Sequence, residues 1–330
     1  MYEQQRVAVV VPAYDEERHV GRVIETMPAF VDRIYAVDDS STDRTWEVIR
    51  AHAVRDPATA ARADGGPRVV PIRHEQNLGA GAAVVTGYRR ALADEMDVVA
   101  VMDGDGQMDP NVLDRIVAPV AEGRAGYAKG DRLSRPELWA GMSRWRTFGN
   151  VLLTQLTRIS TGYWRLSDAQ NGYTAISADA LDRLPLEDLY DRYGFLNDLL
   201  ARLNELDVTV ADVPHEAVYG SEESGISYPS FVPRLSTLLA VNFLRRIAAT
   251  GLVREFHPFL GCYLIGALGL LAGVPTAAAL SSVSAVFVVA ALSVFLLMQG
   301  LVFDWRRNAD LSLRIGDAAA DRNDAPLARN

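Results

Sequence analysis

Four short apolar runs, separated by longer polar stretches, organise the first 120 residues. They are Val7–Val11, Ile34–Val37, Val69–Ile72 and Val98–Met102. Each is too short for a helix and rich in β-branched residues, so each predicts a buried strand. The segments between them predict helices that end near Met27, His52 and Ala93. This alternation predicts an α/β domain with a mainly parallel sheet.

Polar side chains follow three of these strands at the points where the strands end. Tyr14 and Glu16 follow the first, Asp39 follows the second, and Asp105 and Gln107 follow the fourth. In an open α/β sheet, ligands bind at the carboxyl ends of the strands. We therefore expect a nucleotide pocket there, with a ring for stacking, carboxylates for base and ribose, and a metal pair for the pyrophosphate.

The loop Asp103-Gly104-Asp105-Gly106-Gln107 carries the densest set of oxygen ligands in the chain. Carboxylates and an amide suit Mg²⁺ or Mn²⁺ carrying a substrate's phosphates. The glycines would let a ligand approach the backbone. A calcium loop is disfavoured, because Met108 stands where such a loop needs glycine. A solvated acidic turn remains the alternative for the motif taken alone.

Two further turn signals precede predicted helices. Ser41 or Thr42 could cap the helix that runs through His52. Gly79 and Gly81 indicate a glycine helix start packed near a ligand. They do not complete a dinucleotide fingerprint, because Val84 occupies the third glycine position.

The composition changes sharply near the C-terminus, where no residue from Pro258 to Phe303 is charged. A membrane-spanning helix needs about 20 apolar residues. The run predicts two spans, Phe259–Gly273 and Val283–Phe303, with Pro275, Ser281 and Ser282 in or near the turn. The alternative is a buried helical hairpin of a soluble protein.

Basic residues flank the apolar run on both sides, which predicts a multi-pass protein of the cell membrane with both ends cytoplasmic. They are Arg245, Arg246 and Arg254 before the run and Arg306 and Arg307 after it. We expect a catalytic domain over residues 1–230, a juxtamembrane amphipathic segment over 231–256, two spans over 257–304 and a disordered cytoplasmic tail over 305–330.

Overall charge and cysteine content exclude some classes of function. The net charge of −9 and the isoelectric point near 5.1 argue against nucleic acid as a partner. The single cysteine, Cys262, provides no disulfide framework. Arginine carries nearly all the positive charge, because Lys129 is the only lysine, and the sequence alone assigns that lysine no function.

Four motifs in order resemble family 2 glycosyltransferases, and within them the dolichyl- or polyprenyl-phosphate sugar synthases. They are Val-Val-Pro-Ala-Tyr-Asp-Glu-Glu at 10–17, Val-Asp-Asp-Ser-Ser-Thr-Asp at 37–43, Asn-Leu-Gly-Ala-Gly-Ala-Ala at 77–83 and Met-Asp-Gly-Asp-Gly-Gln at 102–107. The resemblance is strongest over residues 7–130. It implies a GT-A fold.

The resemblance also assigns roles to residues of the donor site. Pro12, Tyr14 and Glu16 match the family's nucleotide-base strip, and Val37 and Asp39 its second contact to base and ribose. Asp103, Gly104, Asp105 and Gln107 match its metal and diphosphate loop, in which Asp105 and Gln107 would be the direct ligands and Asp103 a further one. Arg132 matches a basic nucleotide-sugar contact after the fifth strand.

Three further segments are assigned by position. Asp168–Tyr173 matches a segment beside the sugar, and Asp198 lies where the family places an acidic residue at a helix start. Asp198 is the candidate general base, and a solvated helix-start carboxylate is its alternative. The stretch 143–160 could present arginines 144, 146 and 158 to a lipid phosphate, or be an ordinary packed helix.

These matches imply an inverting, metal-dependent glycosyltransferase. It would move a hexose from a UDP- or GDP-linked sugar to polyprenyl or dolichyl phosphate at the membrane, with Mg²⁺ or Mn²⁺ as cofactor. The stretch 219–227 lacks the basic residues that the family often carries there, which favours extension of a lipid-linked glycan at a sugar hydroxyl. A nucleotidyltransferase is disfavoured by the acidic, glycine-free first loop, and a non-catalytic scaffold by the intact acidic loop.

Overall fold

The structure is a computed structural model of the 330-residue chain. It describes residues 2, 4–55, 66–133, 144–216, 228–254, 257–280 and 282–315. The stretch 219–227, where the basic residues are missing, lies outside the described residues. So does the segment from 316 onward.

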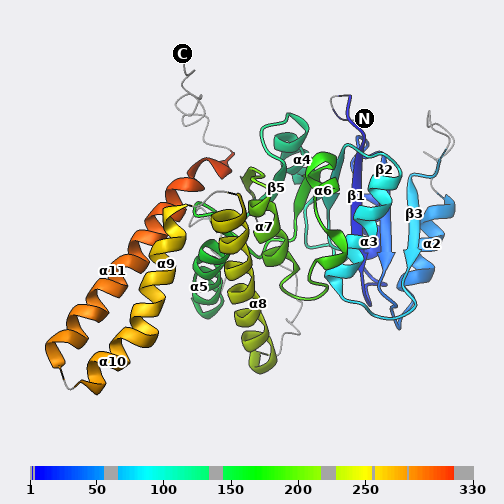
Figure 1. Ribbon diagram of the computed structural model, residues 1–330. Helices are drawn as coiled ribbons and strands as arrows, with labels where there is room; N and C mark the ends of the chain where they lie inside the picture. The colour runs from blue at the N-terminus through cyan, green and yellow to red at the C-terminus, as the bar shows by residue number, and fades with distance from the viewer. Residues whose placement is uncertain are drawn as a thin grey trace, which may run out of the picture.

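One eight-stranded sheet forms the centre of the molecule, in the order β3-β2-β1-β4-β6-β5-β7-β8 (Figure 1). The strands are β1 Val7–Ala13, β2 Arg33–Asp38, β3 Val69–Arg73, β4 Val98–Val101, β5 Tyr127–Asp131, β6 Thr174–Ser177, β7 Val210–Pro214 and β8 Ser312–Arg314. Of these eight described strands, only β6 is antiparallel to its neighbours. The prediction of a mainly parallel α/β sheet is confirmed.

Alternate residues of the central strands pack into two separate cores. On β1, Ala8 and Val10 pack on one face with Tyr88 of α3 and Leu199 of α7. Val7, Val9 and Val11 pack on the other face, which α1, α2 and α4 cover. Burial of both faces explains why these strands are continuous apolar runs instead of alternating ones. The helices of this domain are α1 Val20–Glu25, α2 Thr45–Arg55, α3 Ala80–Ala93, α4 Leu113–Ala121, α5 Arg144–Thr161, α6 Ala178–Asp182 and α7 Phe195–Glu205.

The reversed strand β6 brings an additional segment to the functional edge of the sheet. The other seven strands run in one direction, so their carboxyl ends meet at one edge. Because β6 runs the opposite way, its beginning lies at that edge. The segment 168–173 leads into β6 and is therefore placed beside the loops that follow β1, β4 and β5.

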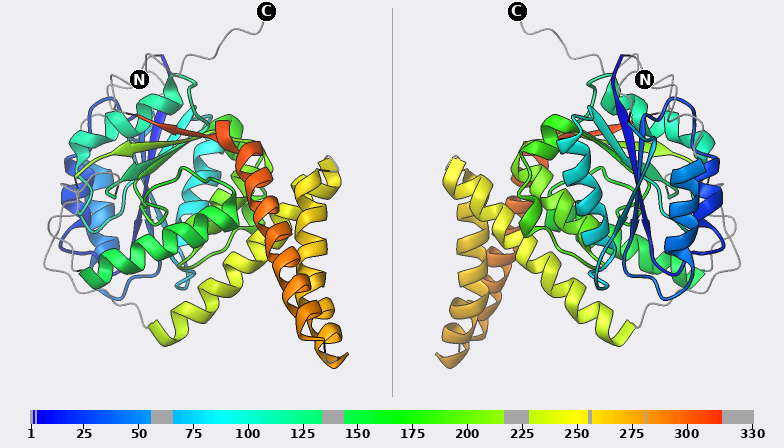
Figure 2. Two further views of the ribbon diagram at one scale, coloured as in Figure 1. Left: turned by 90° about the vertical axis from the view of Figure 1, so that its left-hand side faces the viewer. Right: turned by 90° about the vertical axis from the view of Figure 1, so that its right-hand side faces the viewer.

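Two long apolar helices project from this domain (Figures 1 and 2). The first is continuous over Pro258–Ala279 and includes α9 Pro258–Leu268 and α10 Val274–Ala279; the second is α11 Val283–Arg307. They hold 22 and 25 residues, and only 17% and 11% of their most apolar windows are buried. Both are therefore long and apolar enough to cross a membrane, and the alternative of a buried hairpin is wrong.

The turn between the two spans lies later than expected. Pro275 stands near the start of α10, directly after the π-helical turn Gly269–Gly273, where the helical hydrogen-bond ladder is already irregular and can accommodate a residue without an N–H. The first helix therefore continues past Gly273 to Ala279, about 33 Å at 1.5 Å per residue. The expectation that Pro275 lies in or near the turn is wrong.

The chain returns from the second span to the sheet. After α11, residues 312–314 form β8 parallel to β7, and the Ile315 N–H donates to the Asp212 carbonyl over 2.9 Å. Figure 2 shows this return strand crossing back to the sheet edge. The expectation that residues 305–330 form a disordered tail is therefore wrong for residues 305–315, because residues 312–314 complete the central sheet.

Helix α8 (Tyr228–Ala248) joins the α/β domain to the two long apolar helices, and Arg245 and Arg246 of α8 bind protein carboxylates. Arg245 forms ion pairs with Asp198 and Glu205, at 3.1 and 2.8 Å. Arg246 and Asp304 of α11 are both fully buried and paired at 2.7 Å. The use of Arg246 as a membrane-flanking charge is therefore wrong, since it is fully buried against Asp304, whereas Arg245 keeps 29% of its side chain exposed and stays a predicted flank.

Candidate active site

The acidic loop after β4 packs directly on the end of β1. The Gly104 N–H donates to the Pro12 carbonyl over 3.0 Å. A Cβ at position 104 would lie 3.0 Å from that oxygen and 3.1 Å from the Ala13 Cβ. Gly104 is thus required by packing against β1. Gly106 has a left-handed φ of 75°, and a Cβ there would lie at the ordinary contact distance of 3.7 Å from the His19 Cβ, so the backbone conformation is what favours glycine.

Three carboxylates lie close together at this edge: Asp103, Asp105 and Glu16, which we call the acidic edge cluster. Burial, followed by the charges of Asp105 and Glu16, raises the pKa of the Asp103 carboxyl to about 7, and Arg132 acts in the opposite direction. A carboxylate oxygen of Glu16 lies 2.9 Å from the His19 Nδ1. The Asp105 carboxylate accepts a hydrogen bond from the Gln107 N–H over 2.9 Å. The cluster therefore concentrates negative charge where a cation could bind.

The turn after β1 is fixed by the turn after β2. Asp15 has a left-handed φ of 57°, and its carboxylate accepts from the backbone N–H and the hydroxyl of Thr42, at 2.7 and 3.1 Å. The Ser41 hydroxyl accepts from the Asp15 N–H. Ser41 and Thr42 therefore do not cap α2, which begins only at Thr45. This arrangement holds Tyr14 at the surface with 45% of its area exposed, as a stacking ring requires.

Asp39 lies at the expected strand end but is occupied by protein donors. It is buried, its carboxylate accepts from the N–H groups of Leu78 and Gly79, and it pairs with His74 at 2.7 Å. A role at base and ribose remains a prediction for Asp39. Sequence reasoning missed His74, although it follows β3 at the same edge. Pro12 and Val37 are paired in register, and the Val37 side chain lies in the core.

Gly79 and Gly81 serve a protein contact instead of a ligand. A Cβ on Gly79 would lie 2.6 Å from the Asp191 carbonyl oxygen, and one on Gly81 would lie 2.7 Å from that of Tyr190. The Ala82 N–H also donates to Asp191. The prediction of a glycine helix start is confirmed, since Gly79 is the N-cap of α3, but the prediction that it packs near a ligand is wrong, because the segment 190–191 occupies the space.

Arg132 and Asp168 face the acidic edge cluster from the other side. The Arg132 guanidinium donates to both Asp168 carboxylate oxygens, at 2.6 and 3.2 Å. Burial alone would raise the pKa of the Asp168 carboxyl, but Arg132 and Lys129 together hold it below the usual value. A Cβ on Gly172 would lie 3.2 Å from the Asp103 carboxylate. The structure thus brings segment 168–173 against the acidic loop, as expected.

Asp198 is not a solvated helix-start carboxylate. It is buried at the start of α7, and its oxygens accept from Arg245, Arg202 and the Tyr190 N–H, at 3.1, 3.2 and 3.0 Å. Both carboxylate oxygens are therefore engaged by donors of the protein itself, from α7, α8 and the segment before α7. The geometry supports an anchoring role that joins α7 to α8 more than the role of general base.

Arg158 is also held internally, with its Nε donating to the Leu166 carbonyl over 2.6 Å. The side chains of Arg144 and Arg146 are outside the part of the chain that the structure describes. An arginine face on α5 for a lipid phosphate therefore stays a prediction for those two residues.

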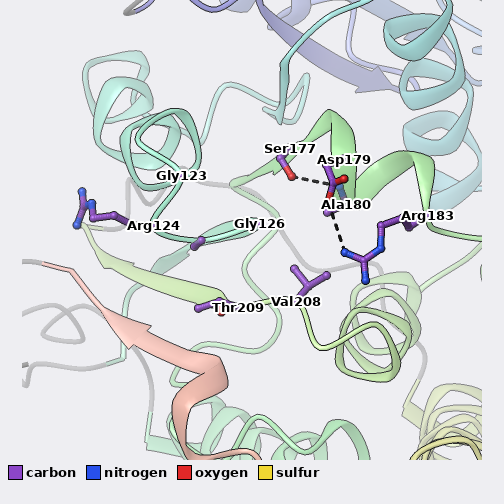
Figure 3. Close-up of a pocket in the computed structure, with 10 residues that line it drawn as sticks. Gly123, Arg124, Gly126, Ser177, Asp179, Ala180, Arg183, Val208 and Thr209 are labelled. Carbon is purple, nitrogen blue, oxygen red and sulfur yellow. Dashed lines mark hydrogen bonds and ion pairs between the residues drawn. The ribbon is translucent and has the colours of Figure 1, made fainter. Parts of the chain in front are cut away.

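A shallow pocket of about 200 Å³ lies elsewhere, near the amino-terminal ends of β5 and β7 (Figure 3). Arg183 and Asp179 line it and pair with each other at 3.4 Å, and Arg183 also donates to the Leu206 carbonyl. Their charges are thus satisfied within the protein, and nothing in this pocket matches the chemistry at the carboxyl edge.

The sheet with its one reversed strand and its acidic carboxyl edge defines a GT-A-type α/β fold. The chain belongs to the family described as "Glycosyl transferase family 2", whose profile matches residues 8–184. It is therefore a glycosyltransferase.

Curated relatives act on lipid phosphates according to their names. One is the UDP-N-acetylglucosamine–dolichyl-phosphate N-acetylglucosaminyltransferase of Methanococcus voltae, 27% identical over 64% of this chain and 86% of that protein. Another is the polyprenol monophosphomannose synthase of Mycolicibacterium smegmatis, 27% identical over 68% of this chain and 80% of that protein.

Solved structures share the fold at lower identity. The glucosyl-3-phosphoglycerate synthase of Mycobacterium tuberculosis in complex with UDP superposes with a TM-score of 0.50 and 22% identity, over 74% of this chain and 80% of that one. The same enzyme has been solved with Mn²⁺, UDP and its product, with a TM-score of 0.50 and 21% identity over the same shares of the two chains. These similarities support the fold.

Proposed function

We propose that this protein is an inverting, metal-dependent glycosyltransferase that moves a hexose from a nucleotide sugar to polyprenyl or dolichyl phosphate. The observation that carries the proposal is the return strand β8. Because β8 completes the catalytic sheet directly after an apolar helix of 25 residues, the acidic edge and the two spans belong to one folded unit. A lipid-borne acceptor is the substrate that needs this arrangement.

The names of the relatives support a lipid phosphate acceptor. The Methanococcus voltae and Mycolicibacterium smegmatis proteins are named for transfer to dolichyl phosphate and for polyprenol monophosphomannose synthesis. One of these names specifies a UDP-linked donor. We therefore infer a UDP- or GDP-linked hexose as the donor for this chain.

The donor atoms at the acidic edge fit a divalent cation such as Mg²⁺ or Mn²⁺. Asp103, Asp105 and Gln107 offer oxygen ligands, and Asp103 is held in mutual repulsion with its neighbours. Among the described residues, no three His, Cys, Asp or Glu side chains are placed so that they could hold a metal ion by themselves. Mg²⁺ usually binds one or two carboxylates together with substrate phosphates, so an incomplete cage suits it. When bound, the cation would stabilise the negative charge of the leaving diphosphate.

The protein's own residues would then orient the two reactants. Tyr14, Glu16 and Asp39 would hold the nucleoside, and Arg132, fixed by Asp168, would bind the diphosphate. A phosphate oxygen of the acceptor forms a bond to the anomeric carbon as the bond from that carbon to the diphosphate oxygen breaks, which inverts the configuration. The leaving group departs as the nucleoside diphosphate anion.

The state of Asp198 bears on the choice of acceptor. A sugar hydroxyl must lose a proton during attack and therefore needs a base. A phosphate monoester is already an anion near neutral pH, since its second pKa is about 6. Because the Asp198 carboxylate is engaged by two arginines, the structure favours the phosphate acceptor. The missing basic residues of stretch 219–227 remain the one observation that favours a lipid-linked sugar hydroxyl.

We further infer a multi-pass protein of the cell membrane whose catalytic domain is cytoplasmic. The return of the chain from α11 to β8 puts both ends of the hairpin on the side of the catalytic domain. Arg306 follows the second span and is exposed, as expected for a cytoplasmic flank.

A transfer assay on purified full-length protein tests the proposal. Labelled UDP-glucose, UDP-N-acetylglucosamine and GDP-mannose are each offered, with Mn²⁺ or Mg²⁺, to polyprenyl phosphate and, in a parallel reaction, to a lipid-linked glycan. We expect label to enter the lipid phase from one donor. The Asp105→Asn variant should lose the transfer, whereas Asp114→Asn, which changes a carboxylate on α4, should keep it. Label that enters only a lipid-linked glycan would identify a hydroxyl acceptor, and no transfer to either acceptor would contradict the proposal.

A further inference from the structure

Lys129 is the only lysine of a chain that otherwise uses arginine for every strong positive charge, and it is buried within the sheet. It lies on β5 with a side-chain exposure of 1%. Its ammonium forms an ion pair with Asp212 of β7 at 2.9 Å. It also donates to the carbonyl oxygens of Asp168 and Gly130, at 2.8 and 3.1 Å.

The three acceptors explain why a lysine and not an arginine stands here. They converge on one nitrogen, which suits the compact ammonium with its three rotatable donors. A planar guanidinium distributes its donors over three nitrogens and needs more space.

The Lys129–Asp212 pair forms hydrogen bonds with the backbone of two consecutive residues, Ser167 and Asp168. The second carboxylate oxygen of Asp212 accepts from the Ser167 N–H over 2.7 Å, while Lys129 donates to the carbonyl of the next residue, Asp168. Residues 167 and 168 are therefore fixed at their amide and their carbonyl. The return strand supports the same point, since Arg314 of β8 donates to the Ser167 hydroxyl over 3.1 Å.

The side chain of Asp168 in turn positions Arg132. Asp168 accepts from the Arg132 backbone N–H and from two of its guanidinium nitrogens. The Arg132 charge acts on Asp103 of the acidic edge cluster. A continuous series of contacts thus runs from Lys129 through Asp168 to Arg132 at the donor site.

Stability alone does not account for this buried pair. Removing two charges from water is unfavourable, and a well-packed apolar pair of similar size is often equally stable or more stable. Specific geometry is what an ion pair with directional partners adds. We propose that Lys129, together with Asp212, is a positioning residue that holds Asp168 so that Arg132 points at the donor's diphosphate. This inference rests on the proposed function for the role of Arg132.

The test compares a charge-free pair with the loss of Arg132 itself. Lys129→Met alone would leave Asp212 buried without its counter-charge, so the variant used is Lys129→Met/Asp212→Asn, which is neutral and keeps an acceptor for Ser167. Dissociation constants for UDP, GDP, UMP and GMP are measured by calorimetry with Mg²⁺ on the full-length chain. The four proteins are the wild type, the neutral pair, Arg132→Ala and the combination. Ile49→Ala, a core substitution in α2, serves as a control for lost stability.

We expect the neutral pair to weaken nucleoside diphosphate binding about tenfold, the loss typical of a misplaced hydrogen bond to a charged group. Monophosphate binding should stay within about twofold, because we expect Arg132 to contact the β-phosphate, which UMP and GMP lack. In the Arg132→Ala background, the neutral pair should weaken nucleoside diphosphate binding by less than about a further twofold, since both changes act through one guanidinium. Unchanged diphosphate binding, full additivity, or a loss equal to that of Ile49→Ala would each overturn the inference.

A second readout separates this inference from the proposed function. Labelling with ¹³C-lysine gives a single side-chain signal, because the chain has one lysine. That signal should shift in Arg132→Ala, which removes the partner of Asp168, and should not shift in Asp114→Asn. A wild type that binds nucleotide but transfers no sugar would contradict only the proposed function. A wild type that binds none of the four nucleotides would also contradict only the proposed function. In that case the lysine signal tests whether Lys129 and Arg132 are coupled, and an unchanged signal in Arg132→Ala overturns the inference.

Discussion

The acidic edge cluster and the junction between α8 and α11 both collect charged side chains, but they balance charge in opposite ways. At the edge, Glu16, Asp103 and Asp105 lie together, and burial, followed by the charges of Asp105 and Glu16, raises the pKa of the Asp103 carboxyl. At the junction, Arg246 and Asp304 are fully buried, and each satisfies the other through two hydrogen bonds of 2.7 and 2.9 Å. Like charges accumulate where a ligand can compensate them, and opposite charges pair where the fold must exclude water.

The junction should show the largest effect on stability. Arg246→Met leaves Asp304 buried without a counter-charge, which costs about 3–5 kcal/mol of unfolding free energy. The double variant Arg246→Met/Asp304→Leu should recover most of that loss, because it removes both charges. Thermal unfolding of the detergent-purified protein measures both. A single variant as stable as the wild type would show that the pair does not hold the junction together.

The acidic edge cluster should show the opposite pattern, a large loss of activity without a loss of stability. Asp105→Asn removes a proposed metal ligand and relieves repulsion with Asp103. We expect sugar transfer to fall about hundredfold or more, with an unchanged or higher melting temperature. Steady-state transfer rates and thermal unfolding of the same sample test this. A melting temperature that falls together with the activity would assign Asp105 to the fold.

Gly79 tests whether the glycines before α3 serve packing. Its φ is 102°, and a Cβ added there would lie 2.6 Å from the Asp191 oxygen, so Gly79→Ala should cost about 1–3 kcal/mol of stability. Nucleotide affinity of the folded fraction should not change. Gly149 of α5 has nothing within 4 Å of such a Cβ, so Gly149→Ala should stabilise the helix slightly. Equal melting temperatures for the two variants would contradict the packing role.

Tyr14 should give the smallest effect. Its exposed ring contributes little to the core, so Tyr14→Ala should leave the melting temperature unchanged. Loss of stacking on the nucleobase should weaken UDP or GDP binding by about 1 kcal/mol, roughly fivefold. Tyr193→Ala, which changes another exposed ring, provides the control in the same calorimetric titration. Equal affinities for wild type and Tyr14→Ala would remove Tyr14 from the base site.

The pattern of apolar and polar residues predicted the first four strands, the segments that follow them and the two apolar helices. The four apolar runs became β1 to β4, because continuous burial on both sheet faces leaves a continuous apolar signature. The segments that follow these strands converged as expected, since parallel strands share one carboxyl edge. The two spans were evident from the absence of charge between Pro258 and Phe303.

Partnerships between distant residues could not be predicted in this way. Arg245 and Arg246 have the pattern of a basic membrane flank, and only the fold shows that Asp198 and Asp304 are their partners. Strand β8 is short and lies far along the chain from β7, with both spans between them, so no local signal marks its pairing. Lys129 was visible as the only lysine, but its role depends on acceptors contributed by β7 and by segment 167–168.

The measurement that tests the central claim most directly is Mn²⁺ binding to the full-length protein, followed by the loss of the free-ion signal in electron paramagnetic resonance. In the presence of UDP or GDP, we predict one bound Mn²⁺ per chain for the wild type and for Asp114→Asn. Asp105→Asn should bind at least about tenfold more weakly, because a carboxylate ligand is lost. Equal binding by wild type and Asp105→Asn, or none by the wild type, would contradict the claim that the acidic edge cluster exists to hold a cation and its nucleotide sugar.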